Sequence, residues 1–202
     1  LLILITLIII YKFLPSMPNK EVKSFKNQLS ILKRPRFIAG TALNLLLITA
    51  WFCSYSYFAD YLSKEKGLST QQISYMLLLF GIMGVISNFL AGRLLGRYMF
   101  WTTLFFLAGT FLLPFAFQYT GSSLLSISIV VGFWGIMYGP CFLIGVGHMV
   151  SAASDAKEFA NSLQTSFGNL GVSLGTAIGG WFINHYGISV TPWTGLGFGA
   201  LA

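Results

Sequence analysis

The sequence has few charged residues, and this scarcity excludes most classes of soluble protein. Only 8% of its 202 residues are Asp, Glu, Lys or Arg, whereas 55% are hydrophobic. A soluble globular domain carries about 25% charged residues. The mean hydropathy of +0.76 and the long apolar runs therefore indicate an integral membrane protein.

The residues that build metal centres and catalytic sites are also scarce. The chain has two His, two Cys and five Asp or Glu. Cys53 and Cys141 each stand alone in an apolar run, which indicates neither a disulfide framework nor a zinc site. An intramembrane enzyme would need paired carboxylates, a Ser/His pair or an H-E-x-x-H motif, and the sequence shows none of these. We therefore expect no enzymatic activity, no metal and no cofactor.

Basic residues give the chain a net charge of +7, but they are not arranged for binding nucleic acid. Seven of the twelve Lys and Arg lie between Lys12 and Arg36, and the others stand singly or in pairs between apolar runs. A nucleic-acid-binding protein gathers such residues on one groove-sized face. Basic connections between apolar runs are instead typical of cytoplasmic loops. This bias places connections 15–36, 92–98 and 149–158 in the cytoplasm, with 61–71 outside.

Hydropathy divides the chain into one partial membrane span, five full spans and another partial one. The predicted spans are 1–14, 37–60, 72–91, 99–118, 123–148, 159–183 and 192–202. The terminal runs are shorter than the roughly 20 residues that cross a bilayer. The first also lacks the basic region and cleavage site of a signal peptide. We therefore expect both ends of the sequence to fall inside membrane helices.

The span 159–183 is rich in small and polar residues, which separate into sectors at 100° per residue. One sector is apolar and suits lipid. The adjacent sector carries Gly168, Gly171, Gly175 and Gly179, which would let another helix backbone approach closely. The third sector holds Asn161, Ser162, Thr165, Ser166, Asn169, Ser173 and Thr176.

Two interpretations of this polar sector stay open. Its groups either make hydrogen bonds between helices or line a water-filled cavity that binds a substrate. Isolated amides are costly in hydrocarbon, so the sector must face protein or water. The number of polar groups favours the cavity, because so many are hard to satisfy by packing alone.

Other spans repeat parts of this pattern. Gly81 and Gly84 begin a glycine stripe in 72–91 with the spacing of the stripe in 159–183, which hints at two related three-helix units. Mixed polar and aromatic stripes mark two further spans, and such stripes occur both on packing faces and on ligand surfaces. The resulting candidates for a substrate cavity are Asn44, Trp51, Tyr55, Trp134, Tyr138, Asn161, Thr165 and Asn169.

Several segments resemble the major facilitator superfamily. GRLLGR at 92–97 resembles the C-terminal copy of its short cytoplasmic loop motif, G-x-x-x-D-R-x-G-R, and supplies Gly92, Arg93, Gly96 and Arg97. ANSLQTSFGNLGVSLGTAIGG at 160–180 resembles the eleventh helix of the drug:proton antiporter branch, particularly its arabinose-efflux-permease-like members. FCSYSYFADYL at 52–62 resembles the end of the seventh helix. Gly96 replaces the Asp of the loop motif, which weakens the case for a gating ion pair there.

The resemblance implies an all-α integral membrane fold of twelve helices. Residues 1–14 would end helix six, 15–36 would form the central cytoplasmic loop, and 37–202 would form the C-terminal six-helix bundle, truncated in helix twelve. The implied partners are the lipid bilayer, a small-molecule substrate and a missing N-terminal six-helix half. The implied location is the cell membrane, as in a bacterial inner membrane.

The function implied by the resemblance is secondary active transport by alternating access, with proton-coupled efflux of drugs or sugars. The proton gradient would supply the energy. No Asp or Glu lies in the middle of a predicted span, so we expect the proton-coupling carboxylate in the missing half. His148, near the end of one span, is the local alternative, although a structural histidine fits that position better. Proton-linked uptake of a sugar or organic solute and a non-transporting membrane sensor remain the alternatives.

Overall fold

The computed structural model describes residues 2–13 and 29–202. Most of the predicted linker 15–36 therefore lies outside the described residues. The described residues form helices and no strand, which confirms the predicted all-α fold. In chain order the elements are α1 (Leu2–Phe13), η1 (Ser30–Lys33), α3 (Pro35–Tyr55), α4 (Phe58–Lys64), α5 (Thr70–Tyr119), α6 (Leu124–Tyr138), α7 (Cys141–Ala152), α8 (Lys157–Tyr186), η2 (Ile188–Trp193) and α9 (Leu196–Leu201).

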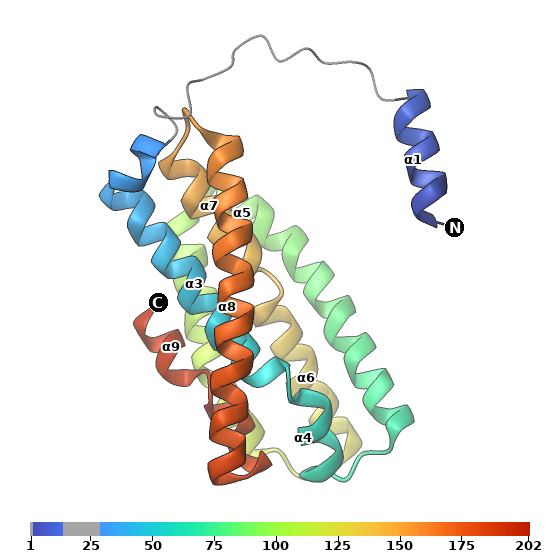
Figure 1. Cartoon of the computed structure of the whole chain (residues 1–202). Helices are drawn as coiled ribbons and strands as arrows, with labels where there is room; N and C mark the ends of the chain where they lie inside the picture. Colours follow the sequence, from blue (N-terminus) through green and yellow to red (C-terminus); the bar gives the residue numbers. More distant parts are fainter. Residues whose placement is uncertain (1, 14–28) are drawn as a thin grey trace.

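Helix α5 is a hairpin of two arms. A straight helix of its 50 residues would be about 75 Å long, more than twice the thickness of the hydrocarbon core. Tyr98 leaves the helical conformation, with φ −137° and ψ 54°. Lys66, just before the first arm, donates hydrogen bonds to the carbonyls of Phe117 and Thr120 at the end of the second arm, at 3.3 and 2.9 Å. The two ends of α5 therefore lie together (Figure 1).

The connection between these arms is much shorter than the sequence predicts. The sequence predicts a loop over 92–98, but helical structure continues through Arg97 and only Tyr98 departs from it. The segment lacks Pro, and its Leu and Arg residues are good helix formers, although Gly92 and Gly96 are poor ones. The turn between the two arms therefore interrupts the helical conformation at a single residue, Tyr98.

Two other predicted spans are each interrupted at one point. The span 37–60 divides at Ser56 and Tyr57, and the span 123–148 divides at Gly139 and Pro140. Pro140 has no N–H to donate, and a proline ring crowds the carbonyl four residues earlier. At the other break, the hydroxyl of Tyr57 donates to the carbonyl of Thr176 on α8, at 2.9 Å. That hydrogen bond ties the break to the neighbouring helix.

Helix α8 packs against α3 along its glycine sector. Gly168, Gly171, Gly175 and Gly179 are all buried. A Cβ atom at Gly175 would lie 2.5 Å from the carbonyl oxygen of Thr49, and one at Gly179 would collide with the carbonyl of Cys53. The two backbones are therefore in direct contact, which any larger residue would prevent.

Helix α6 packs closely against the first arm of α5. A Cβ atom at Gly135 would lie 2.5 Å from the carbonyl oxygen of Phe80, and one at Gly139 would lie 2.7 Å from the Cα atom of Gly84. Gly84 is buried in this contact, but Gly81 is exposed and has open space where a Cβ would sit. The predicted packing role of Gly81 is thus not seen, because α6 crosses α5 on the face of Phe80 and Gly84.

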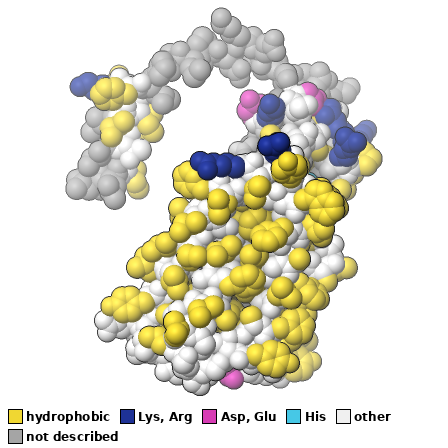
Figure 2. Space-filling view, turned by 180° about the vertical axis from the view of Figure 1, so that it is seen from behind, with side chains coloured by type: hydrophobic (Ala, Val, Ile, Leu, Met, Phe, Trp, Pro, Cys, Tyr) yellow, Lys and Arg dark blue, Asp and Glu magenta, His cyan; other side chains and the backbone are white. Residues whose placement is uncertain are grey.

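The surface of the bundle suits a bilayer. Figure 2 shows a broad apolar face with Lys and Arg gathered at one end. Large apolar side chains such as Phe89, Trp101 and Phe105 are exposed, and so large an apolar surface is typical of contact with lipid. Three described stretches are long and apolar enough to cross a membrane: Pro35–Lys64, Thr70–Tyr119 and Leu124–Ala152.

Candidate functional site

The structure distributes the eight predicted cavity residues over three environments. Asn44 lies inside the helix packing. Four aromatic residues form part of one ring cluster. The remaining three lie on the exposed side of α8. Each environment has a different chemistry.

The side chain of Asn44 is fully buried between α3, α7 and α8. It donates to the backbone carbonyl of Gln164 at 3.3 Å, and the Gln164 amide donates to its Oδ1 at 3.2 Å. Gly145 of α7 stands against the same oxygen, where a Cβ atom would collide. The Asn44 amide therefore joins helices instead of facing open space.

Sequence reasoning missed Gln164, although it is buried on α8. The spacing between Gln164 and the glycine stripe of α8 would have identified it. Gln164 stands four residues before Gly168 and therefore shares the face that packs on α3. An amide on a packing face predicts a partner on the opposing helix, which is Asn44.

The aromatic cluster extends from the interior of the bundle to its surface. Trp134 and Tyr138 of α6 are buried, whereas Trp51 and Tyr55 of α3 are partly exposed. The ring centres of Trp51 and Tyr138 are 6.0 Å apart, and those of Tyr55 and Trp134 are 6.3 Å apart. Phe142 of α7 is exposed and is not among the predicted cavity residues. Its ring centre lies 5.4 Å from that of Trp51.

The polar side of α8 contains Asn161, Thr165 and Asn169, all exposed. The Thr165 hydroxyl donates to the carbonyl of Asn161 at 3.1 Å. Ser162, Ser166 and Ser173 donate in the same way to the carbonyl four residues earlier. These hydroxyls are thus satisfied within the helix.

The side-chain amides of Asn161 and Asn169 have no hydrogen-bond partner among residues 2–13 and 29–202. An unpartnered amide in hydrocarbon costs several kcal/mol, on the order of 4 or more by transfer to an apolar liquid. Lipid is therefore a poor neighbour for this side of α8. Water or another protein segment would satisfy both amides.

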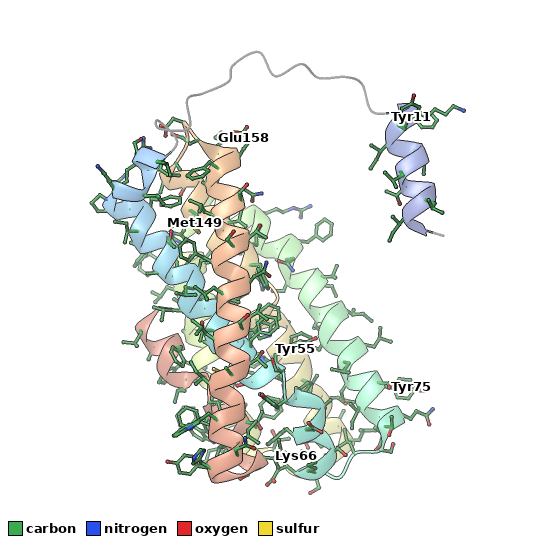
Figure 3. The ribbon with its side chains drawn as sticks, viewed as in Figure 1. Tyr11, Tyr55, Lys66, Tyr75, Met149 and Glu158 are labelled. Atoms are coloured by element: carbon green, nitrogen blue, oxygen red, sulfur yellow. The ribbon has the colours of Figure 1, made fainter. Side chains whose placement is uncertain are left out.

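Phe142 connects the amide side of α8 with the aromatic cluster. A Cβ atom at Gly168, the neighbour of Asn169, would lie 3.5 Å from a ring carbon of Phe142. Figure 3 shows Tyr55 in the region between α8 and the first arm of α5. We name the resulting surface the α8 face. It consists of Trp51, Tyr55, Phe142, Asn161, Thr165 and Asn169.

The α8 face combines aromatic rings with neutral amides and carries no formal charge. Aromatic rings bind apolar or sugar-ring surfaces, and amides orient the polar groups of a ligand. Among the described residues, no group of three or more His, Cys, Asp and Glu is placed to hold a metal ion. Rings and neutral amides of this kind suit contact with a neutral or amphipathic molecule.

The loop-motif residues Gly92, Arg93, Gly96 and Arg97 end the first arm of α5 and are exposed. Neither arginine forms a salt bridge with a described carboxylate. The Arg97 guanidinium instead lies 5.3 Å from the ring centre of Tyr98. Both cations stand at a helix C-terminus, where the backbone dipole favours positive charge.

A different arginine forms the ion pair at this end of the bundle. Arg34, just before α3, donates to both carboxylate oxygens of Asp155, at 2.6 and 2.8 Å. Asp155 lies in the connection between α7 and α8. This two-point contact joins the start of α3 to that connection, and it was not predicted from the sequence.

The comparison with protein families agrees with this architecture. A model of the Major Facilitator Superfamily matches residues 41–202, which span most of α3 through α9. The match covers most of the chain and includes both the aromatic cluster and the polar side of α8. Members of this superfamily are multi-pass membrane proteins that act as secondary transporters. The chain belongs to the Major Facilitator Superfamily.

Proposed function

We propose that this chain forms the C-terminal half of a secondary transporter that exports small molecules such as drugs or sugars by proton-coupled alternating access. The α8 face would line the substrate path. The observation that carries this proposal is that two unpartnered amides lie on the exposed side of α8, which Phe142 connects to the partly exposed rings of the aromatic cluster. A packing surface would pair these amides within the chain, as the bundle does for Asn44 and Gln164.

The α8 face would lie opposite an N-terminal six-helix half of the same protein. Two halves around a shared cavity would place water and substrate against Asn161 and Asn169 and keep lipid away from them. The apolar surface on the other side of the bundle would meet the bilayer (Figure 2). This arrangement gives each surface the neighbour that its chemistry requires.

The position of the acidic residues supports a coupling group outside this chain. Asp60 stands in α4 near the end of its span, 3.8 Å from Lys64. Asp155 and Glu158 lie at the opposite end, around the start of α8. Proton coupling requires a titratable group in the substrate pathway. In the proposed transporter, a carboxylate from the N-terminal half supplies that group.

Counterflow in proteoliposomes tests the proposal. Full-length protein is reconstituted into vesicles loaded with unlabelled solute, and uptake of the same labelled solute is followed. Neutral and amphipathic drugs and sugars form the panel, and protein-free vesicles are the control. We expect labelled solute to accumulate transiently for at least one member. Absence of exchange across the whole panel by folded protein would contradict the proposal and favour a sensor.

The direction of coupling needs a separate measurement. An inward proton gradient is imposed on vesicles preloaded with the transported solute, and the movement of protons is followed with a pH-sensitive dye. Proton entry linked to solute exit supports antiport. Proton and solute movement in the same direction would instead support the uptake alternative.

A further inference from the structure

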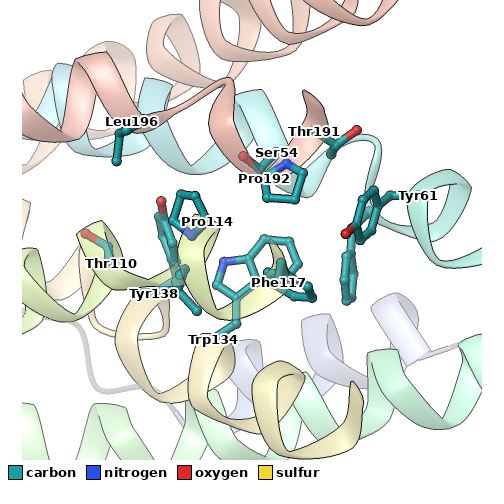
Figure 4. A pocket seen from close by; sticks show the side chains of 12 residues that line it. Ser54, Tyr61, Thr110, Pro114, Phe117, Trp134, Tyr138, Thr191, Pro192 and Leu196 are labelled. Atoms are coloured by element: carbon teal, nitrogen blue, oxygen red, sulfur yellow. The ribbon is translucent and has the colours of Figure 1, made fainter. Parts of the chain in front are cut away.

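A second, smaller site lies inside the bundle. A narrow cavity opens between α4, the second arm of α5, α6 and η2 (Figure 4). It has room for about one water molecule. None of the six residues of the α8 face lines it, and neither does any residue of α8. The cavity is therefore distinct from the α8 face, although Trp134 and Tyr138 of its wall contact Tyr55 and Trp51 of that face.

Three buried aromatic residues bring polar atoms to this cavity. Tyr61, Trp134 and Tyr138 are 4%, 3% and 8% exposed. No described residue forms a hydrogen bond with their phenol oxygens or indole nitrogen. Buried polar groups are almost always hydrogen-bonded, to protein or to ordered water. These three atoms therefore need a partner that the protein does not supply.

The three polar atoms also touch open space. In the described part of the chain, the one fully enclosed side-chain N or O atom without a partner is Nε1 of Trp51. The polar atoms of Tyr61, Trp134 and Tyr138 thus keep room for a water-sized neighbour. The ring centres of Trp134 and Tyr138 are 6.1 Å apart. Figure 4 shows both rings at the cavity wall.

The chemistry of the wall defines the ligand. The indole N–H of Trp134 can only donate, whereas phenol groups donate and accept. The hydroxyls of Thr110 and Thr191 use their hydrogens on the carbonyls of Leu107 and Ile188, at 2.8 and 2.6 Å, so their oxygens remain as acceptors. The ligand must both accept and donate, and no charged residue lines the cavity. Water meets these requirements in size, charge and hydrogen bonding.

Lys66, in the α4–α5 connection, contacts two residues of the cavity wall. Its ammonium group lies 5.9 Å from the ring centre of Tyr61 and donates to the carbonyl of Phe117, and both of these residues line the cavity. A further hydrogen bond to the carbonyl of Thr120 holds the α4–α5 connection on the end of α5. We propose that the cavity is a hydration site, in which Tyr61, Trp134 and Tyr138 bind ordered water and Lys66 seals it from the surface.

Radiolytic hydroxyl-radical footprinting of the full-length protein tests the bound water. X-rays generate radicals from water held beside a side chain, so a buried residue next to bound water is oxidised. After correction for intrinsic reactivity, we expect Trp134 and Tyr138 to be oxidised several-fold faster than Phe37 and Met149, which are buried away from the cavity. Equal rates in all four residues would show a dry cavity and overturn the proposal.

The seal is tested by the rate of exchange with ¹⁸O-labelled water. Protein is mixed rapidly into labelled water before irradiation, and the ¹⁸O content of the oxidation products on Trp134 and Tyr138 is followed against mixing time. Lys66→Met should speed the exchange several-fold, whereas Lys64→Met, which alters an exposed lysine two residues away, should leave it unchanged. Unchanged exchange in folded Lys66→Met would refute the seal. The footprinting of unaltered protein tests the hydration site even if that variant does not fold.

Discussion

Asn44 and Asn169 carry the same amide in opposite situations. Asn44 is enclosed, and both ends of its amide bond to Gln164. Asn169 is exposed on α8, and no described residue bonds to its side chain. The first amide stabilises the packing of helices, whereas the second remains available to a ligand. Substitution of each residue should therefore affect a different property.

Asn169→Leu should impair transport more than folding. Leucine keeps a helix-forming side chain on α8 and removes an amide that has no described partner. Counterflow activity per folded molecule is the measurement, and size-exclusion chromatography reports the folded fraction. Leu170→Ala, at the next position, which is also exposed, is the matched control. If activity and folded protein fall by the same factor, the amide has a structural role instead.

Asn44→Leu should lower stability, because the Gln164 amide loses its partner within the bundle. Removing one side of a buried hydrogen bond costs about 1 to 2 kcal/mol, and interhelical bonds in membranes lie at the lower end. Thermal unfolding in detergent measures the effect. The double variant Asn44→Leu/Gln164→Leu should be more stable than the sum of the single losses predicts. Strict additivity would show that the two amides are not coupled.

At the scale of helices, Gly175→Leu should disrupt the bundle. A Cβ atom at Gly175 would already lie 2.5 Å from the carbonyl oxygen of Thr49, so leucine would force α8 away from α3. Gly81→Leu is the matched control, since open space surrounds that position on another helix. Membrane abundance and thermal stability should fall sharply for the first variant alone. A stable, active Gly175→Leu protein would refute the close approach of the two helices.

Helical periodicity explains how much of the architecture could be predicted. The sectors of α8 follow from 100° per residue, so the sequence alone separates its glycines from Asn161 and Asn169. Periodicity does not predict the breaks at Ser56–Tyr57 and Tyr98. The first break contacts Thr176 on another helix, and the second is the turn at which α5 reverses direction. The aromatic cluster also contains residues that are far apart in the sequence, such as Trp51 and Phe142. Such residues come into contact only through tertiary packing. Periodicity assigns a residue to a face but does not identify the opposing helix.

At the scale of the whole molecule, charge distinguishes the two ends of the bundle. Arg34, Arg93, Arg97 and Lys157 stand at helix ends that the alternating chain direction brings to the same side. The connection 61–71 at the opposite end contains two lysines and one acidic residue, Glu65. Basic residues in short connections favour the cytoplasmic side. We therefore expect the end that carries Arg93 and Arg97 to face the cytoplasm.

Cysteine accessibility tests this orientation. Gly96→Cys and Ser154→Cys should react with a membrane-impermeant maleimide only in inverted vesicles, whereas Ser63→Cys and Gly121→Cys should react only in right-side-out vesicles. All four positions are exposed, and the native Cys53 and Cys141 are buried, so background labelling should be low. The pairing of the sites tests the fold, because the hairpin of α5 places residue 96 opposite residues 63 and 121. Labelling of Gly96→Cys and Ser63→Cys from the same side would contradict the hairpin, whereas a reversed pattern with the same pairs would contradict only the orientation.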